Sequence, residues 1–299
     1  MKYRVIHKTT YYGHEPVSIG HNKAWLEPRP VPHQQLDSFS LKIEPEPSVR
    51  NHQVDYYGNP VTLFSFNEGY LKLNVTATSF LTVSPTGSSA NPQTPVPPVP
   101  PLAWEDVREL IRAHSTPESL QAFEFVFPSS RAVWSPEMRD YALQSFTSRR
   151  PILSALQELT ERIHKDFVYD SKATSVTTPV VDVFRMRRGV CQDFAHLQVS
   201  MLRSIGMAAR YVSGYLRTYP PAGKPRLIGA DASHAWLSVY CGPADQWVDV
   251  DPTNNRFCST DHITLAWGRD YSDVPPLTGV FIGGGQHRLS VEVDVMPLM

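Results

Sequence analysis

The first 85 residues repeat apolar and polar positions with a period of two. The alternation runs through four segments, which are 3–13, 38–47, 52–66 and 70–83. Such a period is typical of strands with one buried and one exposed face, and the letters YYGNP at 56–60 are typical of a turn between strands. We therefore predict an all-β domain over residues 1–85, folded as a β-sandwich or a small barrel.

The alternation of apolar and polar residues ends after about residue 85. Residues 84–104 are rich in proline, serine and threonine, which is typical of a linker with polyproline character, and we assign 86–102 to that linker. Docking of this stretch into an aromatic groove of a partner is an alternative to a plain spacer. The remaining chain, 103–299, is predicted to be one α+β core that includes the C-terminal strands.

Within the core, helical spacing appears at 103–114, 135–146 and 151–167, and again after Cys191. After Cys191, successive apolar residues are separated by 3, 4, 1 and 3 positions, as on one face of a helix. These residues are Phe194, Leu197, Met201, Leu202 and Ile205. Gly206 is placed to end this helix. Strands are predicted next at 208–216, 234–241 and 246–251, and further strands close the chain around a glycine-rich turn.

Charge, hydropathy and cysteine spacing argue against several classes of function. The formal charge of −1 gives no reason to expect a nucleic acid or an anionic membrane as partner. No apolar run is long enough to cross a membrane, and the first residues lack a signal-peptide core, so a cytoplasmic location is expected. A zinc site from Cys241, Cys258 and His262 fits no standard ligand spacing, so neither metal nor cofactor is predicted.

The cysteine at the start of the predicted helix suggests chemistry. Cys191 would stand in the first turn, where unpaired N–H groups and the positive end of the helix dipole favour a thiolate and lower the thiol pKa. A thiolate there is a nucleophile, and the adjacent N–H groups can hold an oxyanion. The alternative is that Cys191 is simply a small buried residue at a helix end.

A nucleophile of this kind needs a base and a group that orients the base. His234 begins a predicted strand and shares one face of it with Trp236. On the next strand Asp249 and Asp251 share a face, and either could fix the imidazole of His234. Alternation alone does not choose between the two carboxylates, and either could instead cap the turn that follows.

Taken together, these motifs resemble the transglutaminase-like superfamily, whose members have a papain-like thiol fold. The letters that carry the resemblance to bacterial members are GVCQDFAHL, ARYVSGYL, SHAW and WVDVDPTNN. GRDYSDVPPLTGVF and the N-terminal β region are similar to the bacterial form with a β domain ahead of the core. The resemblance covers nearly the whole chain and is weakest over 85–150. It implies a helix carrying the cysteine, packed on an antiparallel sheet.

The resemblance also implies roles for single residues. The family's nucleophile falls on Cys191, its base on His234, and its carboxylate on the aspartate before the Pro-Thr pair, which is Asp251. Tyr169 is a candidate for the place of the tryptophan that holds the oxyanion in animal members. No acidic cluster matches their calcium sites. Asp193 in the first turn is interpreted as structural, and His196 as a packing residue.

These assignments predict an enzyme that transfers the acyl group of a peptide or protein amide through a thioester on Cys191. Hydrolysis, as in a cysteine peptidase or amidase, is favoured over crosslinking of protein glutamine to amines, because it is a common expectation for bacterial members. A catalytically silent peptide-binding module is the alternative of another class. Three aromatic residues are candidates to line the substrate cleft: Tyr215, Trp236 and Trp247. The sequence leaves the substrate and the oligomeric state open.

Overall fold

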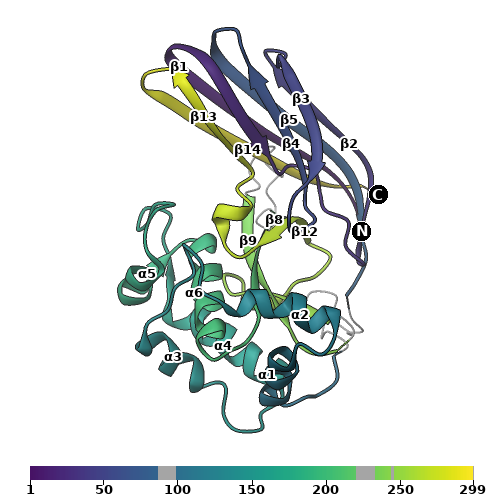
Figure 1. Ribbon diagram of the computed structural model, residues 1–299, viewed down its shortest axis with the longest axis vertical. Helices are drawn as coiled ribbons and strands as arrows, with labels where there is room; N and C mark the ends of the chain where they lie inside the picture. Colours follow the sequence, from purple (N-terminus) through teal and green to yellow (C-terminus); the bar gives the residue numbers. More distant parts are fainter. Residues whose placement is uncertain (87–98, 220–232, 244–245, 299) are drawn as a thin grey trace.

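The computed structural model describes residues 1–86, 99–219, 233–243 and 246–298. An all-β N-terminal region precedes an α+β core, as predicted. In Figure 1 the N-terminal strands fill the upper half and the helices the lower half, with β8, β9 and β12 of the core between them. Most of the predicted Pro-rich linker, 87–98, lies outside the described residues.

One long strand organises the N-terminal region. Strand β1 (Lys2–Ala24) has an irregularity between Tyr12 and Val17 that divides it into two parts. The first part pairs with β5 (Tyr70–Val83) on one side, and the second with β4 (Pro60–Phe66). Strand β2 (Gln34–Glu44) extends the sheet beyond β5, and β3 (Val49–Val54) extends it beyond β4.

Apolar side chains from both parts of this sheet meet in a common core. Leu41, Ile43 and Val75 come from β2 and β5, while Phe64 and Phe66 come from β4. Along each strand these buried residues alternate with more exposed ones, which explains the period of two seen in the sequence. Because β1 belongs to both parts, the region has the character of a sandwich made from one continuous sheet.

The C-terminal strands belong to this sheet and not to the core to which the sequence analysis assigned them. Strand β14 (His287–Leu298) pairs antiparallel with the first part of β1, from Lys2↔Leu298 to Gly13↔His287. Strand β13 (Leu277–Gly283) pairs with the second part. The sequence contains no local sign of this pairing, because the partners are separated by almost the whole chain.

The core packs helices on a second antiparallel sheet. Its helices are α1 (Trp104–Ala113), α2 (Pro117–Phe123), η1 (Glu124–Val126), α3 (Pro136–Leu143), α4 (Ile152–Asp166), α5 (Val180–Met186), α6 (Cys191–Ser204) and η2 (Tyr271–Asp273). The sheet has the order β11 (Arg256–Phe257), β10 (Trp247–Asp251), β9 (Ser233–Tyr240), β8 (Ala209–Leu216), β12 (His262–Gly268). A short parallel pair is formed by β6 (Val168–Tyr169) and β7 (Arg188–Gly189). Apolar residues of α6, including Leu197 and Met201, pack with Leu237 and Val239 of β9.

Two side-chain amides from the N-terminal region cover the outer edge of β12. The amide of Gln34 donates to the Thr264 carbonyl at 2.8 Å and accepts from the Thr264 N–H at 2.9 Å. The amide of Asn59 does the same for Trp267, at 2.9 and 3.0 Å. Each amide thus replaces one residue of a neighbouring strand, so the edge of the core sheet depends on the N-terminal region.

We expect Gln34→Ala and Asn59→Ala each to lower the free energy of unfolding by about 3 kcal/mol, because each leaves a backbone N–H and a C=O of β12 without partners. The measurement is urea unfolding followed by circular dichroism. Gln35→Ala is the matched control, since Gln35 is exposed on the same strand, and its effect should stay within about 0.5 kcal/mol. Equal effects at Gln34 and Gln35 would contradict the role given to the amide pair.

Candidate active site

The turn before α6 positions Cys191 at the first residue of that helix. Asp193 fixes this turn: its carboxylate accepts the Val190 N–H at 2.8 Å and the Thr174 hydroxyl at 2.6 Å. Gly189 lies against the same carboxylate, and a Cβ on it would come within 2.7 Å of Asp193 Oδ2. Asp193 is therefore structural, as interpreted from its place in the first turn, and Cys191 stays partly exposed.

Two neighbouring strands bring the predicted base and one of the two candidate carboxylates together. His234 stands near the start of β9, and Asp251 at the end of β10, which runs antiparallel to it. His234 Nε2 and Asp251 Oδ2 are 2.8 Å apart, and both side chains are buried. Asp249 instead accepts a hydrogen bond from Trp236 Nε1 at 3.2 Å. Of the two carboxylates that alternation left equivalent, Asp251 is therefore the one hydrogen-bonded to His234.

Asp251 is held by several donors at once. The backbone N–H groups of Thr253 and Asn254 donate to its Oδ1 at 2.9 and 3.1 Å. The Asn254 amide donates to Oδ2 at 2.7 Å, and His262 Nε2 lies 3.1 Å from the same oxygen. Burial alone would raise the pKa of Asp251, but the charge and hydrogen bond of His234 and the hydrogen bond of His262 hold it well below its usual range. Asp251 is therefore a carboxylate at any pH near neutrality.

The charge of Asp251 in turn controls the protonation of His234. Burial lowers the pKa of His234, but the charge and hydrogen bond of Asp251, together with the nearby Cys191, raise it to about 10. Since Nε2 is bonded to Asp251, the nitrogen available to the thiol is Nδ1. Because the pKa is raised in the fold, the imidazolium persists through neutral pH and is lost only as the pH rises toward 10. A cation therefore faces Cys191 at physiological pH.

Tyr169 lies beside this group. Strand β6 pairs Tyr169 with Gly189, two residues ahead of Cys191. Burial and the charge of Cys191 both raise the pKa of the Tyr169 hydroxyl, as expected for a phenol close to the sulfur. The ring is 56% exposed, so the site is open to water at this side. Tyr169 remains a candidate to hold an oxyanion.

The prediction that three aromatic residues line the substrate cleft is wrong for two of them. Tyr215 and Trp236 are fully buried; the Tyr215 hydroxyl is 2.9 Å from His7 Nδ1, and Trp236 packs against His234 and His262. Trp247 lines a separate cavity. Strand aromatics were equally compatible with a core position, and the close packing of the sheet decides in its favour.

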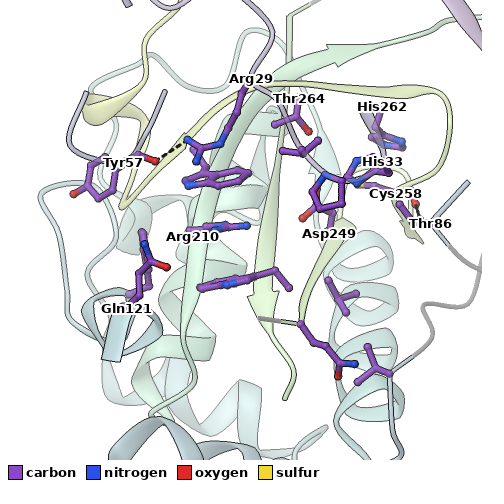
Figure 2. Close-up of a pocket in the computed structure, with 18 of the residues that line it drawn as sticks. Arg29, His33, Tyr57, Thr86, Gln121, Arg210, Asp249, Cys258, His262 and Thr264 are labelled. Atoms are coloured by element: carbon purple, nitrogen blue, oxygen red, sulfur yellow. Dashed lines mark hydrogen bonds between the residues drawn. The ribbon is translucent and has the colours of Figure 1, made fainter. Parts of the chain in front are cut away.

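That cavity, of about 1370 Å³, lies between loops of the N-terminal region, the α2–η1 segment and the outer part of the core sheet (Figure 2). Along one wall, guanidinium and indole groups alternate: Arg29 lies 3.4 Å from the Trp267 ring, and Arg210 lies 3.6 Å from Trp267 and 4.0 Å from Trp247. Asp249 and His262 also line the cavity and lie to the right of these groups in Figure 2. Cys191, His234 and Asp251 do not line it, so this cavity is distinct from the candidate active site.

The sequence suggested His262 only as a zinc ligand and gave no sign of its contact with Asp251. Among the described residues, the side-chain atoms that could bind a metal lie within 4.8 Å of one another in His234, Asp251 and His262. Cys241 and Cys258 are not part of this cluster. Hydrogen bonds account for this proximity. His262 stands 11 positions after Asp251, across a turn, and no periodicity links the two.

Comparison with known proteins agrees with this architecture. Residues 3–82 match the bacterial transglutaminase-like N-terminal region, and 140–252 match the transglutaminase-like superfamily. An uncharacterized protein of Mycobacterium tuberculosis is 38% identical over 99% of this chain and 93% of its own length. The chain belongs to the transglutaminase-like superfamily. All three residues proposed above as nucleophile, base and carboxylate lie inside the 140–252 match.

Two further proteins are similar to this chain in fold or in part of the sequence. A candidate cysteine protease from Cytophaga hutchinsonii has the same fold, with a TM-score of 0.73 and 20% identity over 100% of this chain and 92% of that one. A protein-glutamine gamma-glutamyltransferase of Pseudomonas aeruginosa is 33% identical over 42% of this chain and 18% of its own length. The superfamily and its fold support a thiol enzyme. Within the described residues, no helix is both long and apolar enough to span a membrane.

Proposed function

We propose that this protein is a thiol acyl-transfer enzyme that acts on amide bonds of peptides or proteins. The observation that carries the proposal is the arrangement of three groups: a partly exposed cysteine at a helix start, a buried histidine whose pKa that cysteine helps to raise, and a buried carboxylate hydrogen-bonded to the histidine. A silent binding module would not need a buried charge pair, which is costly to maintain without a function.

The geometry supports the following steps. The Cys191 thiolate attacks the amide carbonyl carbon, and the Tyr169 hydroxyl stabilises the resulting oxyanion. As the C–N bond breaks, the His234 imidazolium gives its Nδ1 proton to the leaving nitrogen, which departs as an amine or ammonia. A thioester remains. Neutral His234 then takes a proton from water, the hydroxide attacks the thioester, and the carboxylic acid leaves as the thiolate is restored.

Asp251 takes no proton in these steps. Its carboxylate accepts the Nε2–H of His234, which keeps Nδ1 directed at the thiol and stabilises the imidazolium. The two backbone N–H groups and the Asn254 amide fix the carboxylate itself. The base is thus oriented by a group whose own position is set by the turn that follows β10.

The acceptor of the acyl group is proposed to be water. Support comes from the exposure of the described surroundings: Tyr169 is 56% and Val168 58% exposed, so nothing on this side excludes water from the thioester. Transfer to a lysine amine, giving a protein-glutamine transglutaminase, is the second candidate, because the relative from Pseudomonas aeruginosa carries that name and the same groups serve both reactions.

We expect hydrolysis to exceed transfer when the protein is incubated with casein and a fluorescent primary amine. New amino termini and new glutamate side chains report hydrolysis, and fluorescence retained on casein reports transfer; ammonia from glutamine is released in both reactions and does not separate them. Protein inactivated beforehand with iodoacetamide is the control for contaminating activities. Amine incorporation faster than hydrolysis on the same substrate would reverse the assignment in favour of a transglutaminase.

A further inference from the structure

A second histidine is bonded to the same carboxylate oxygen as the proposed base. His262 begins β12 and is 2% exposed, and its Nε2 lies 3.1 Å from Asp251 Oδ2. His234 Nε2 reaches that oxygen at 2.8 Å from the other strand. Asp251 Oδ2 therefore stands between two imidazole rings, and Cys191 helps to raise the pKa of the His234 ring.

The other ring nitrogen of His262 determines its tautomer. The Ser259 N–H donates to His262 Nδ1 at 3.2 Å. An amide N–H can only donate, so Nδ1 is the acceptor and the proton of the neutral ring is on Nε2. His262 Nε2–H must then donate to Asp251. Burial also lowers the pKa of His262, which keeps the ring neutral.

The turn that holds His262 is itself fixed from two sides. The Tyr3 hydroxyl, on β1, donates to the Thr260 carbonyl at 3.0 Å. The Tyr219 hydroxyl donates to Asp261 Oδ1 at 2.9 Å. The His262 ring also meets the Trp236 indole edge to face, with centroids 5.3 Å apart. The ring thus has little freedom to leave Asp251.

We propose that His262 is a positioning residue for the acyl-transfer reaction: as a fixed neutral donor, it holds the Asp251 carboxylate in the orientation that directs His234 Nδ1 at Cys191. This inference rests on the proposed function. A neutral His262 gives the buried carboxylate of Asp251 a hydrogen bond without adding a second positive charge. The negative charge of Asp251 therefore acts fully on the imidazolium of His234.

The charged and titratable groups around His262 agree with a neutral donor. Asp251 faces it from β10, His234 from β9 and Arg256 from β11. The positive charges of His234 and Arg256 oppose a proton on His262, while Asp251 favours one. His262 also lines the cavity described above, together with Asp249 and Cys258 (Figure 2).

The test compares wild type with His262→Leu, His262→Gln and His234→Ala. Leucine removes both hydrogen bonds, whereas the glutamine amide can accept from Ser259 and donate to Asp251 but cannot titrate. The measurement is the rate at which iodoacetamide alkylates Cys191, followed by mass spectrometry of its peptide between about pH 5 and pH 9. At about pH 6 we expect His262→Leu to slow alkylation about tenfold, and His262→Gln to stay within about threefold of wild type.

The outcomes separate this inference from the proposed function. If wild type reacts no faster at pH 6 than His234→Ala, the proposed function fails. If wild type exceeds His234→Ala and His262→Leu equals wild type, only the role of His262 fails. Should the leucine variant not fold, nitrogen NMR of wild type decides: an Nε2–H tautomer that is neutral from pH 6 to 9 supports the proposal, and ordinary titration near neutrality overturns it.

Discussion

Alanine in place of Cys191 is expected to abolish turnover of any peptide or glutamine substrate that the protein accepts, with a loss in kcat on the order of 10⁶-fold. The reason is that no other described group in the site can form the thioester: His234, Asp251 and Tyr169 supply protons, charge and a hydrogen bond. The measurement is release of amine or of new amino termini from that substrate under saturating conditions.

The matched control for this substitution is Cys241→Ala. Cys241 is fully buried at the end of β9, where its thiol donates to the Val239 carbonyl at 3.4 Å. Its loss should cost stability but leave kcat near that of wild type, whereas Cys191→Ala should keep the melting temperature because the side chain is partly exposed. Activity that survives in Cys191→Ala would show that the chemistry lies elsewhere.

The second large effect is expected at Asp251. In Asp251→Asn the new amide presents an N–H to His234 Nε2, which must then accept and place its proton on Nδ1. In that tautomer Nδ1 carries a proton toward the thiol, so it cannot accept a proton from water or from the cysteine. We expect a loss in kcat/KM of about 10⁴-fold, as for the wrong histidine tautomer in other catalytic triads.

Asp249→Asn provides a control on the same strand, two positions away. An asparagine there can still accept from the Trp236 indole N–H, the contact that Asp249 makes now. Its kcat/KM should stay within about threefold of wild type. Comparable losses in the two variants, measured with the same substrate and with melting temperatures as a check on folding, would contradict the choice of Asp251.

Much of the fold follows from patterns within short segments. The period of two predicted the strands that carry His234 and Asp251, and the helical spacing after Cys191 predicted α6 with its end near Gly206, which has the positive φ of +84° expected there. These elements were predictable because each depends on which of its own faces is buried. The resemblance then singled out Asp251, which strand alternation left equivalent to Asp249.

What the sequence could not provide depends on contacts between distant segments. The addition of β13 and β14 to the N-terminal sheet leaves no local trace, because both strands alternate in the same way whichever sheet they join. Tyr215 and Trp236 were misplaced because an aromatic residue on a strand suits a core as well as a cleft. The role of His262 depends on a turn that returns the chain to Asp251.

The pairing of β1 with β13 and β14 separates the order of synthesis from the order of folding. During translation, β1 is made well before its neighbours β13 and β14, because the core lies between them in the sequence. Until then, the side of β1 that pairs with these strands presents unpaired backbone groups, which are a template for strands of other molecules. The nascent chain therefore needs protection from aggregation until β13 and β14 have been made. Because these pairings join residues that are distant in the sequence, closure of the sheet is expected to be a late and slow event.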